Sequence, residues 1–170
     1  MSLIIKTRCY NSTIMQKLQE TVKSFGRSMR RQYARIVLGF DYESLYKSAG
    51  VFKPLRHEKP WGYEDWVWNS RSYCGKILFI RKGYQSSWHY HNRKDEVLYL
   101  SSGVLKVLSS SGDDIMKSTE NLVPAGQSFH VFPGLRHRLI ALEDVTIFEF
   151  STSHYEEDTA RLALGGFISK

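Results

Sequence analysis

The sequence predicts an all-β domain, built as a sandwich or closed barrel of short strands, behind a basic helical extension. From Trp61 onward, short segments rich in β-branched and aromatic residues follow one another. Turn residues, mostly glycine and proline, separate these segments roughly every 8–12 residues, a spacing typical of sandwiches and barrels. The first 40 residues differ from the rest, because they carry the whole surplus of positive charge.

The N-terminal segment is predicted to form an amphipathic helix. Its apolar residues recur at steps of three and four, which places them on one helix face: Ile14, Leu18, Val22, Phe25 and Met29. Residues 1–40 carry eight basic groups against one acidic group, which accounts for the net charge of +7. We therefore predict a basic helical extension over residues 1–57, including a short helix over 41–49, and a β domain over residues 58–170.

Composition and charge argue against several classes of protein. No apolar run reaches the ~20 residues that a membrane-spanning helix needs, so we expect no transmembrane segment. Residues 41–170 hold sixteen basic and sixteen acidic groups, which argues against a nucleic-acid partner for the folded domain. Cys9 and Cys74 are too few for a disulfide framework, and no signal-peptide core is visible, so a cytoplasmic location is expected.

The basic N-terminus leaves alternatives for location. An acid-poor, basic amphipathic segment is also typical of mitochondrial transit peptides, so a mitochondrial location is the alternative. Such a helix also suits binding at a membrane surface. The remaining interpretation is an ordinary surface helix that packs on the barrel or on a partner subunit.

Eight strands are expected in the β domain. Their ranges are 64–68, 76–81, 87–91, 97–101, 104–108, 128–132, 138–142 and 145–150. Pro54 and Pro60 favour extended chain before the first strand. Gly83 and Gly103 stand at turns, where glycine permits a positive φ angle. Residues 109–111 are expected to form a hairpin loop.

Three histidines and one glutamate form a candidate metal site. His89 and His91 are two residues apart on a predicted strand, so their side chains share one face. Glu96 follows after a short link, and His137 lies just past a Pro-Gly turn. Three imidazoles and one carboxylate suit one divalent ion, with zinc, manganese and iron as the leading candidates, and leave positions open for water or substrate.

The spacing of these residues resembles the two sequence motifs of the cupin superfamily. The first motif runs without a gap through Gly83, His89, His91, Glu96 and Gly103. The second is similar to the stretch 126–137, although the family usually has proline where Phe132 stands. The resemblance implies a double-stranded β-helix, a jelly-roll barrel of the RmlC-like type, in which the three histidines and Glu96 hold one divalent metal ion.

Within this superfamily, the chain resembles the mannose-6-phosphate isomerase-like group over residues 58–162. The segments that carry the resemblance are 59–64 (KPWGYE), 75–78 (GKIL), 89–96 (HYHNRKDE), 148–154 (FEFSTSH) and 158–162 (DTARL). It implies a metal-dependent isomerase that moves a proton between neighbouring carbons of a sugar phosphate. Cupins commonly form homodimers, so a homodimer is expected.

Candidate residues for substrate and catalysis follow from this chemistry. A phosphate group needs cations, and we expect Lys76, Arg136 and Arg161 to bind the substrate. His130 and Lys76 are the candidates for proton transfer. Two other functions stay open. Family members often have glutamine where His89 stands, and cupins with three histidines often bind iron and activate oxygen, so an iron-dependent oxygenase is one alternative. A non-catalytic sugar-binding or regulatory cupin is the other.

Overall fold

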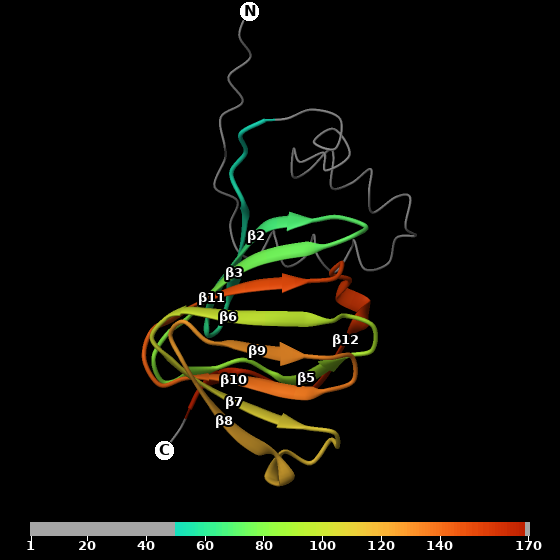
Figure 1. The fold of residues 1–170 in the computed structure, drawn as a ribbon. Helices are drawn as coiled ribbons and strands as arrows, with labels where there is room; N and C mark the ends of the chain where they lie inside the picture. The colour runs from blue at the N-terminus through green and yellow to red at the C-terminus, as the bar shows by residue number, and fades with distance from the viewer. Residues whose placement is uncertain (1–49, 169–170) are drawn as a thin grey trace, which may run out of the picture. The chain divides into compact units, whose positions relative to one another are not determined.

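The computed structural model describes residues 50–168. Both predicted helices, over the N-terminal segment and over 41–49, lie outside the described residues. The unit that contains the β domain begins at Phe52. Its described part consists of strands and two short 3-10 helices, so the predicted all-β class is confirmed (Figure 1). Among residues 50–168, no helix is long and apolar enough to cross a membrane.

One sheet has six antiparallel strands in the order β1-β2-β3-β11-β6-β9, which Figure 1 shows side by side from β2 to β9. Their bounds are Leu55–Lys59 (β1), Gly62–Asn69 (β2), Cys74–Ile80 (β3), Val145–Ser151 (β11), Glu96–Ser102 (β6) and Ser128–Val131 (β9). Strand β1 crosses the boundary that we predict at residue 58, since Leu55 already pairs with Trp66 on β2. Strand β11 lies between β3 and β6, so segments far apart in sequence become neighbours.

The second sheet shares the apolar core with the first and supplies the rest of the barrel (Figure 1). Its path is β12-β5-β10-β4-β13, and β7 pairs with both β10 and β8. The bounds are Tyr84–Gln85 (β4), Trp88–His91 (β5), Val104–Ser110 (β7), Thr119–Pro124 (β8), Arg136–Ala141 (β10), Thr159–Ala163 (β12) and Gly166–Phe167 (β13). The 3-10 helices cover Ile115–Lys117 and Glu156–Asp158.

Each of the eight predicted strand ranges overlaps one observed strand. The strands that the sequence pattern did not predict are β1, β4, β8, β12 and β13. The link between β7 and β8 covers residues 111–118, so the hairpin loop expected at 109–111 begins two residues too early, since Ser109 and Ser110 belong to β7. Strand identity was therefore predictable wherever buried and exposed positions alternate over a long enough run, as along β3 and β6.

The interior changes from apolar to charged along the strands. Where β3 pairs with β11, Ile80 lies opposite Val145 and Leu78 lies opposite Ile147, and all four side chains are buried. At the next inward-facing pair, Lys76 lies opposite Glu149, and both of these are buried too. One end of the barrel therefore holds the apolar core, and the other end holds a group of buried charges.

Gly103 makes the turn from β6 to β7 with a φ angle of 84°, as the sequence predicts. A Cβ atom at this position would lie 2.3 Å from the backbone oxygen of Asp144. Gly126 has nearly the same φ angle, 85°, but a Cβ atom there would meet nothing within 4 Å. The two glycines therefore separate the cost of the backbone conformation from the cost of close approach.

Gly103→Ala is expected to destabilise the protein more than Gly126→Ala. A left-handed backbone costs an L-residue about 1–2 kcal/mol, and this cost applies at both positions. Only at Gly103 does overlap with a neighbouring backbone add to it. Denaturant unfolding of the two variants measures the difference. An equal loss in the free energy of unfolding for both variants would mean that the backbone at Asp144 moves away from the added Cβ atom without an energetic cost.

Candidate metal centre

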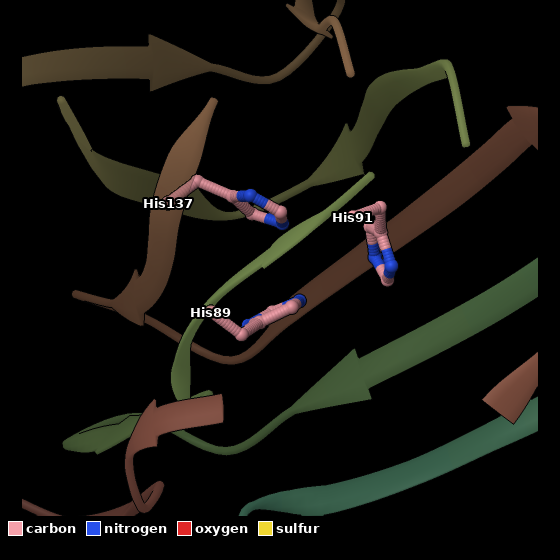
Figure 2. Close-up of side chains that lie close together, drawn as sticks. All are labelled: His89, His91 and His137. Atoms are coloured by element: carbon pink, nitrogen blue, oxygen red, sulfur yellow. The ribbon is translucent and has the colours of Figure 1, made fainter. Parts of the chain in front are cut away.

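The three predicted histidine ligands meet inside the barrel. His89 and His91 lie on β5, and His137 lies on the neighbouring strand β10, where it pairs with His89. One ring nitrogen from each of the three lies within 4.8 Å of the others. Figure 2 shows the imidazoles from these two strands turned toward a common space. This arrangement provides three nitrogen donors for one ion.

Hydrogen bonds on the far side of each ring fix which nitrogen faces the centre. The Nδ1 of His89 lies 2.9 Å from the backbone oxygen of Ser87, and the Nδ1 of His137 lies 3.1 Å from that of Leu135. A carbonyl only accepts, so both Nδ1 atoms carry the proton and leave Nε2 as the free donor. The Nδ1 of His91 lies 3.3 Å from the hydroxyl of Thr159. Each ligand is therefore held by a partner outside the centre.

Burial also keeps two of the imidazoles neutral. It lowers the pKa of His89 well below the ordinary value and that of His91 to about 4. The other histidines of the cluster add to the effect, because a charged imidazole beside them would be repelled. A neutral imidazole has a lone pair to offer, so at neutral pH these side chains are in the form that binds metal.

Glu96 reaches the same centre from the opposite sheet. It is the first residue of β6, and its side chain is 4% exposed. One carboxylate oxygen lies 3.6 Å from the Nε2 of His91, and the other lies 3.6 Å from the Nε2 of His137. The structure thus brings together all four residues that the sequence predicts as ligands. Three imidazoles and one carboxylate fit a borderline divalent ion such as zinc, manganese or iron.

A chain of buried charges extends from Glu96 across the six-stranded sheet. The ammonium of Lys94 donates hydrogen bonds to Glu96 and Glu149. Glu149 also lies 3.7 Å from the ammonium of Lys76, which in turn lies 3.8 Å from Glu64. Burial alone would raise the pKa of Glu149, but Lys76 and Lys94 lower it far below the ordinary value. We call these alternating groups, from Glu64 to Glu96, the buried ion chain.

A cavity of about 260 Å³ connects the metal ligands with this chain. Its wall includes two of the predicted substrate residues, Lys76 and Arg161. Arg161 lies on β12 opposite His89 and forms an ion pair of 2.8 Å with Glu156. Lys76 is 4% exposed, and its ammonium lies 3.3 Å from the Nδ1 of His154. Both cations therefore border the space that a metal-bound molecule would occupy.

The other two predicted residues lie outside the cavity wall. Arg136 bonds the carboxylate of Asp113 at 2.7 Å and stacks on the ring of Tyr90. His130 is 57% exposed on β9 and lies 3.1 Å from Asp95. Neighbouring side chains alternate along a strand, and the inward positions beside them belong to His137 and Val131. Alternation thus places Arg136 and His130 away from the cavity.

The lining residues that were not singled out from the sequence include Glu64, Lys94, Glu149 and His154. Each lies in a segment that carries the resemblance to the isomerase-like group, but that resemblance alone assigned them no role. Strand alternation could have found Glu64 and Glu149, because both are charged residues at strand positions where alternation expects apolar ones. Lys94 lies in the link between β5 and β6, so alternation does not apply to it. His154 follows the end of β11, so no such signal exists for it.

Comparison with known proteins supports the fold. No family model matches the chain, and no curated protein matches it. Among solved structures, an oxalate decarboxylase variant from Bacillus subtilis superposes with a TM-score of 0.57 at 19% identity, covering 68% of this chain and 34% of that one. KdgF from Halomonas sp. superposes with a TM-score of 0.54 at 16% identity, and the match covers 64% of this chain and 98% of that one. The capsular polysaccharide assembling protein CapF from Staphylococcus aureus superposes with a TM-score of 0.58 at 14% identity, and the match covers 80% of this chain and 46% of that one.

These likenesses concern the fold alone. The chain spans only about a third of the length of the oxalate decarboxylase structures. The match confirms the jelly-roll barrel that the cupin motifs imply, and the histidine cluster stands where those motifs place it. The described domain has the cupin fold, and its three-histidine cluster offers three nitrogen donors, within 4.8 Å of one another, to a divalent metal ion.

Proposed function

We propose that this protein is a metal-dependent sugar-phosphate isomerase of the mannose-6-phosphate isomerase-like type. The observation that carries the proposal is the charge of the cavity wall. Four cationic side chains, Lys59, Lys76, Lys94 and Arg161, face four acidic ones, Glu64, Glu96, Glu149 and Glu156. A divalent ion would leave a surplus of two positive charges, and a phosphate ester carries about −1.5 to −2 at pH 7.

The size of the cavity supports a small substrate. A volume of about 260 Å³ suits a molecule with a single sugar ring rather than an oligosaccharide. The three histidines and Glu96 would hold the ion. When bound, such an ion polarises the oxygens of an adjacent carbonyl and hydroxyl and stabilises the charge of an enediolate. Arg161, near the ligand His89, would bind the phosphate group.

Proton exchange with solvent tests the proposal directly. The metal-loaded protein is incubated in deuterium oxide with a panel of aldose and ketose phosphates, and NMR follows both isomerisation and deuterium entry at C1 and C2. We expect interconversion of one aldose–ketose pair, loss of the activity with a chelator, and recovery when metal is returned. The unphosphorylated sugars serve as controls and should react far more slowly. Absence of exchange for every phosphate would refute the isomerase proposal.

One observation favours a second candidate, an iron-dependent oxygenase. His89 adds a third imidazole to the donor set, and imidazole and carboxylate donors also suit ferrous iron. Elemental analysis of protein purified without oxygen, followed by oxygen-uptake measurements, distinguishes the two functions. Zinc or manganese without oxygen uptake supports the isomerase. Ferrous iron with substrate-dependent oxygen uptake supports the oxygenase.

A further inference from the structure

An acid and a base face the metal centre from across the cavity. Glu64 lies on β2 and Lys76 on β3, both in the six-stranded sheet. The three histidines lie on strands of the other sheet, and all five residues line one cavity. A molecule bound at the metal centre would therefore have the imidazoles on one side and the Glu64–Lys76 pair on the other.

Contacts hold the Glu64 carboxylate in place and in its charged form. One oxygen accepts a hydrogen bond of 3.0 Å from the indole N–H of Trp66, and the other lies 3.4 Å from the ammonium of Lys59. Burial would raise the pKa of Glu64, but Lys76, Lys59 and Trp66 together lower it below the ordinary value. Glu64 thus has the unprotonated carboxylate that a general base needs.

Lys76 is positioned as the acidic partner. Its ammonium is 4% exposed and lies 3.8 Å from Glu64, 3.7 Å from Glu149 and 3.3 Å from the Nδ1 of His154. It also lies 4.9 Å from the ring centroid of Trp66, the same residue that bonds Glu64. The surrounding side chains therefore fix the ammonium beside the carboxylate, at the wall of the cavity.

The other carboxylates of the cavity wall have different engagements. Glu149 accepts from Lys94 and from Ser151, and it is almost fully buried. Glu156 is 62% exposed and is paired with both Arg161 and His154. Glu96 belongs to the metal ligands. Among the described residues that line the cavity, Glu64 is thus the remaining carboxylate. It is largely shielded from solvent, it is not a candidate metal ligand, and it lies at the end of the buried ion chain.

We propose that Glu64 and Lys76 are the proton-transfer pair of the isomerisation, an assignment that rests on the proposed function. Glu64 takes the proton from C2 of the aldose, and the C–H electron pair forms the C1–C2 double bond. The carbonyl π pair moves to O1, which takes a proton from Lys76. Glu64 then returns its proton to C1, O2–H gives its proton to Lys76, and the C2 carbonyl forms. Both residues end in their starting states, and no redox partner is needed.

Glu64→Gln tests this assignment, with Glu58→Gln as the matched control. Both changes remove one carboxylate at constant size, but Glu58 is exposed on the neighbouring strand β1 and does not line the cavity. We expect Glu64→Gln to lower kcat and the rate of deuterium entry at C1 and C2 roughly 10²–10⁴-fold, the usual worth of general base catalysis. Metal content should not change and KM should change little, and Glu58→Gln should behave as the wild type.

The outcomes separate the assignment from the proposed function. If wild-type protein exchanges deuterium and Glu64→Gln does so equally well, Glu64 is not the base. If wild-type protein exchanges no proton with any sugar phosphate, the isomerase proposal fails and the assignment fails with it. Should Glu64→Gln fold poorly by thermal melting, Glu64→Asp decides. It keeps the carboxylate, so we expect exchange between that of the wild type and background, whereas full activity with the base displaced would contradict the assignment.

Discussion

Replacing His91 with alanine is expected to leave the protein without its metal ion. Loss of an outer partner of a metal ligand already lowers metal affinity by about 10–100-fold, so loss of a ligand itself should cost more than about 100-fold. Metal at 100 times its dissociation constant stabilises a folded protein by about 2.7 kcal/mol, and this increment should vanish. Elemental analysis after dialysis and melting curves with and without added metal measure both effects.

His130→Ala is the matched control for this experiment. His130 is also an imidazole on a strand, but it is exposed and bonded to Asp95 outside the cavity. Its removal should leave one ion per chain and leave the metal-dependent rise in melting temperature unchanged. Full metal occupancy in His91→Ala would contradict the ligand assignment. Metal loss in His130→Ala would instead mean that the centre depends on groups beyond the cluster.

Lys94→Met is expected to produce the largest loss of stability, measured on metal-free protein. Lys94 is 2% exposed and donates to both Glu96 and Glu149, so its removal leaves two buried carboxylates without their shared cation. Removing one partner from a buried ion pair costs about 3–5 kcal/mol, because the remaining charge is desolvated and unpaired. Denaturant unfolding of the variant and the wild type measures this loss in the free energy of unfolding. Added metal should recover part of the loss, since a cation would again stand beside Glu96.

A surface ion pair supplies the control for Lys94. Lys106 and Glu120 form a contact of 3.1 Å on the β7–β8 hairpin, with side chains 30% and 65% exposed. Lys106→Met removes the same charge and adds the same side chain, but exposed pairs are worth only about 0–1 kcal/mol. A similar loss in both variants would mean that the buried ion chain contributes no more than solvated charges do.

The long strands were predictable from sequence because burial alternates along them. Strands β3 and β6 bury every second residue, which gives a clear two-residue period. Among the missed strands, β1 alternates only between half-buried and exposed positions, and the others have no two-residue period. Strand β8 buries only Val123 among six residues, and β12 buries none, since each lies at an edge of its sheet. Strands β4 and β13 have two residues each, too few for any period.

The candidate metal ligands were predictable because a known motif fixes their spacing, so no knowledge of the fold was needed. The buried ion chain was not predictable, because its members come from strands whose neighbours are set by tertiary topology. Glu149 meets Lys76 only because β11 lies beside β3. Strand alternation, applied to an inward-facing His137, is by itself enough to direct the adjacent Arg136 away from the cavity. Local sequence patterns therefore predict the candidate ligands, whereas the members of the buried ion chain depend on the order in which the strands pair.

The division of the barrel into an apolar end and a charged end has a consequence for how its chemistry can change. Side chains such as Ile80 and Leu100 belong to the apolar cluster between the two sheets, four residues along their strands from Lys76 and Glu96. Partly exposed groups at the mouth of the charged end, such as Arg161 and Glu156, lie outside this apolar cluster. A library of variants restricted to this mouth should therefore yield folded proteins with altered substrate preference, as natural divergence on one scaffold would.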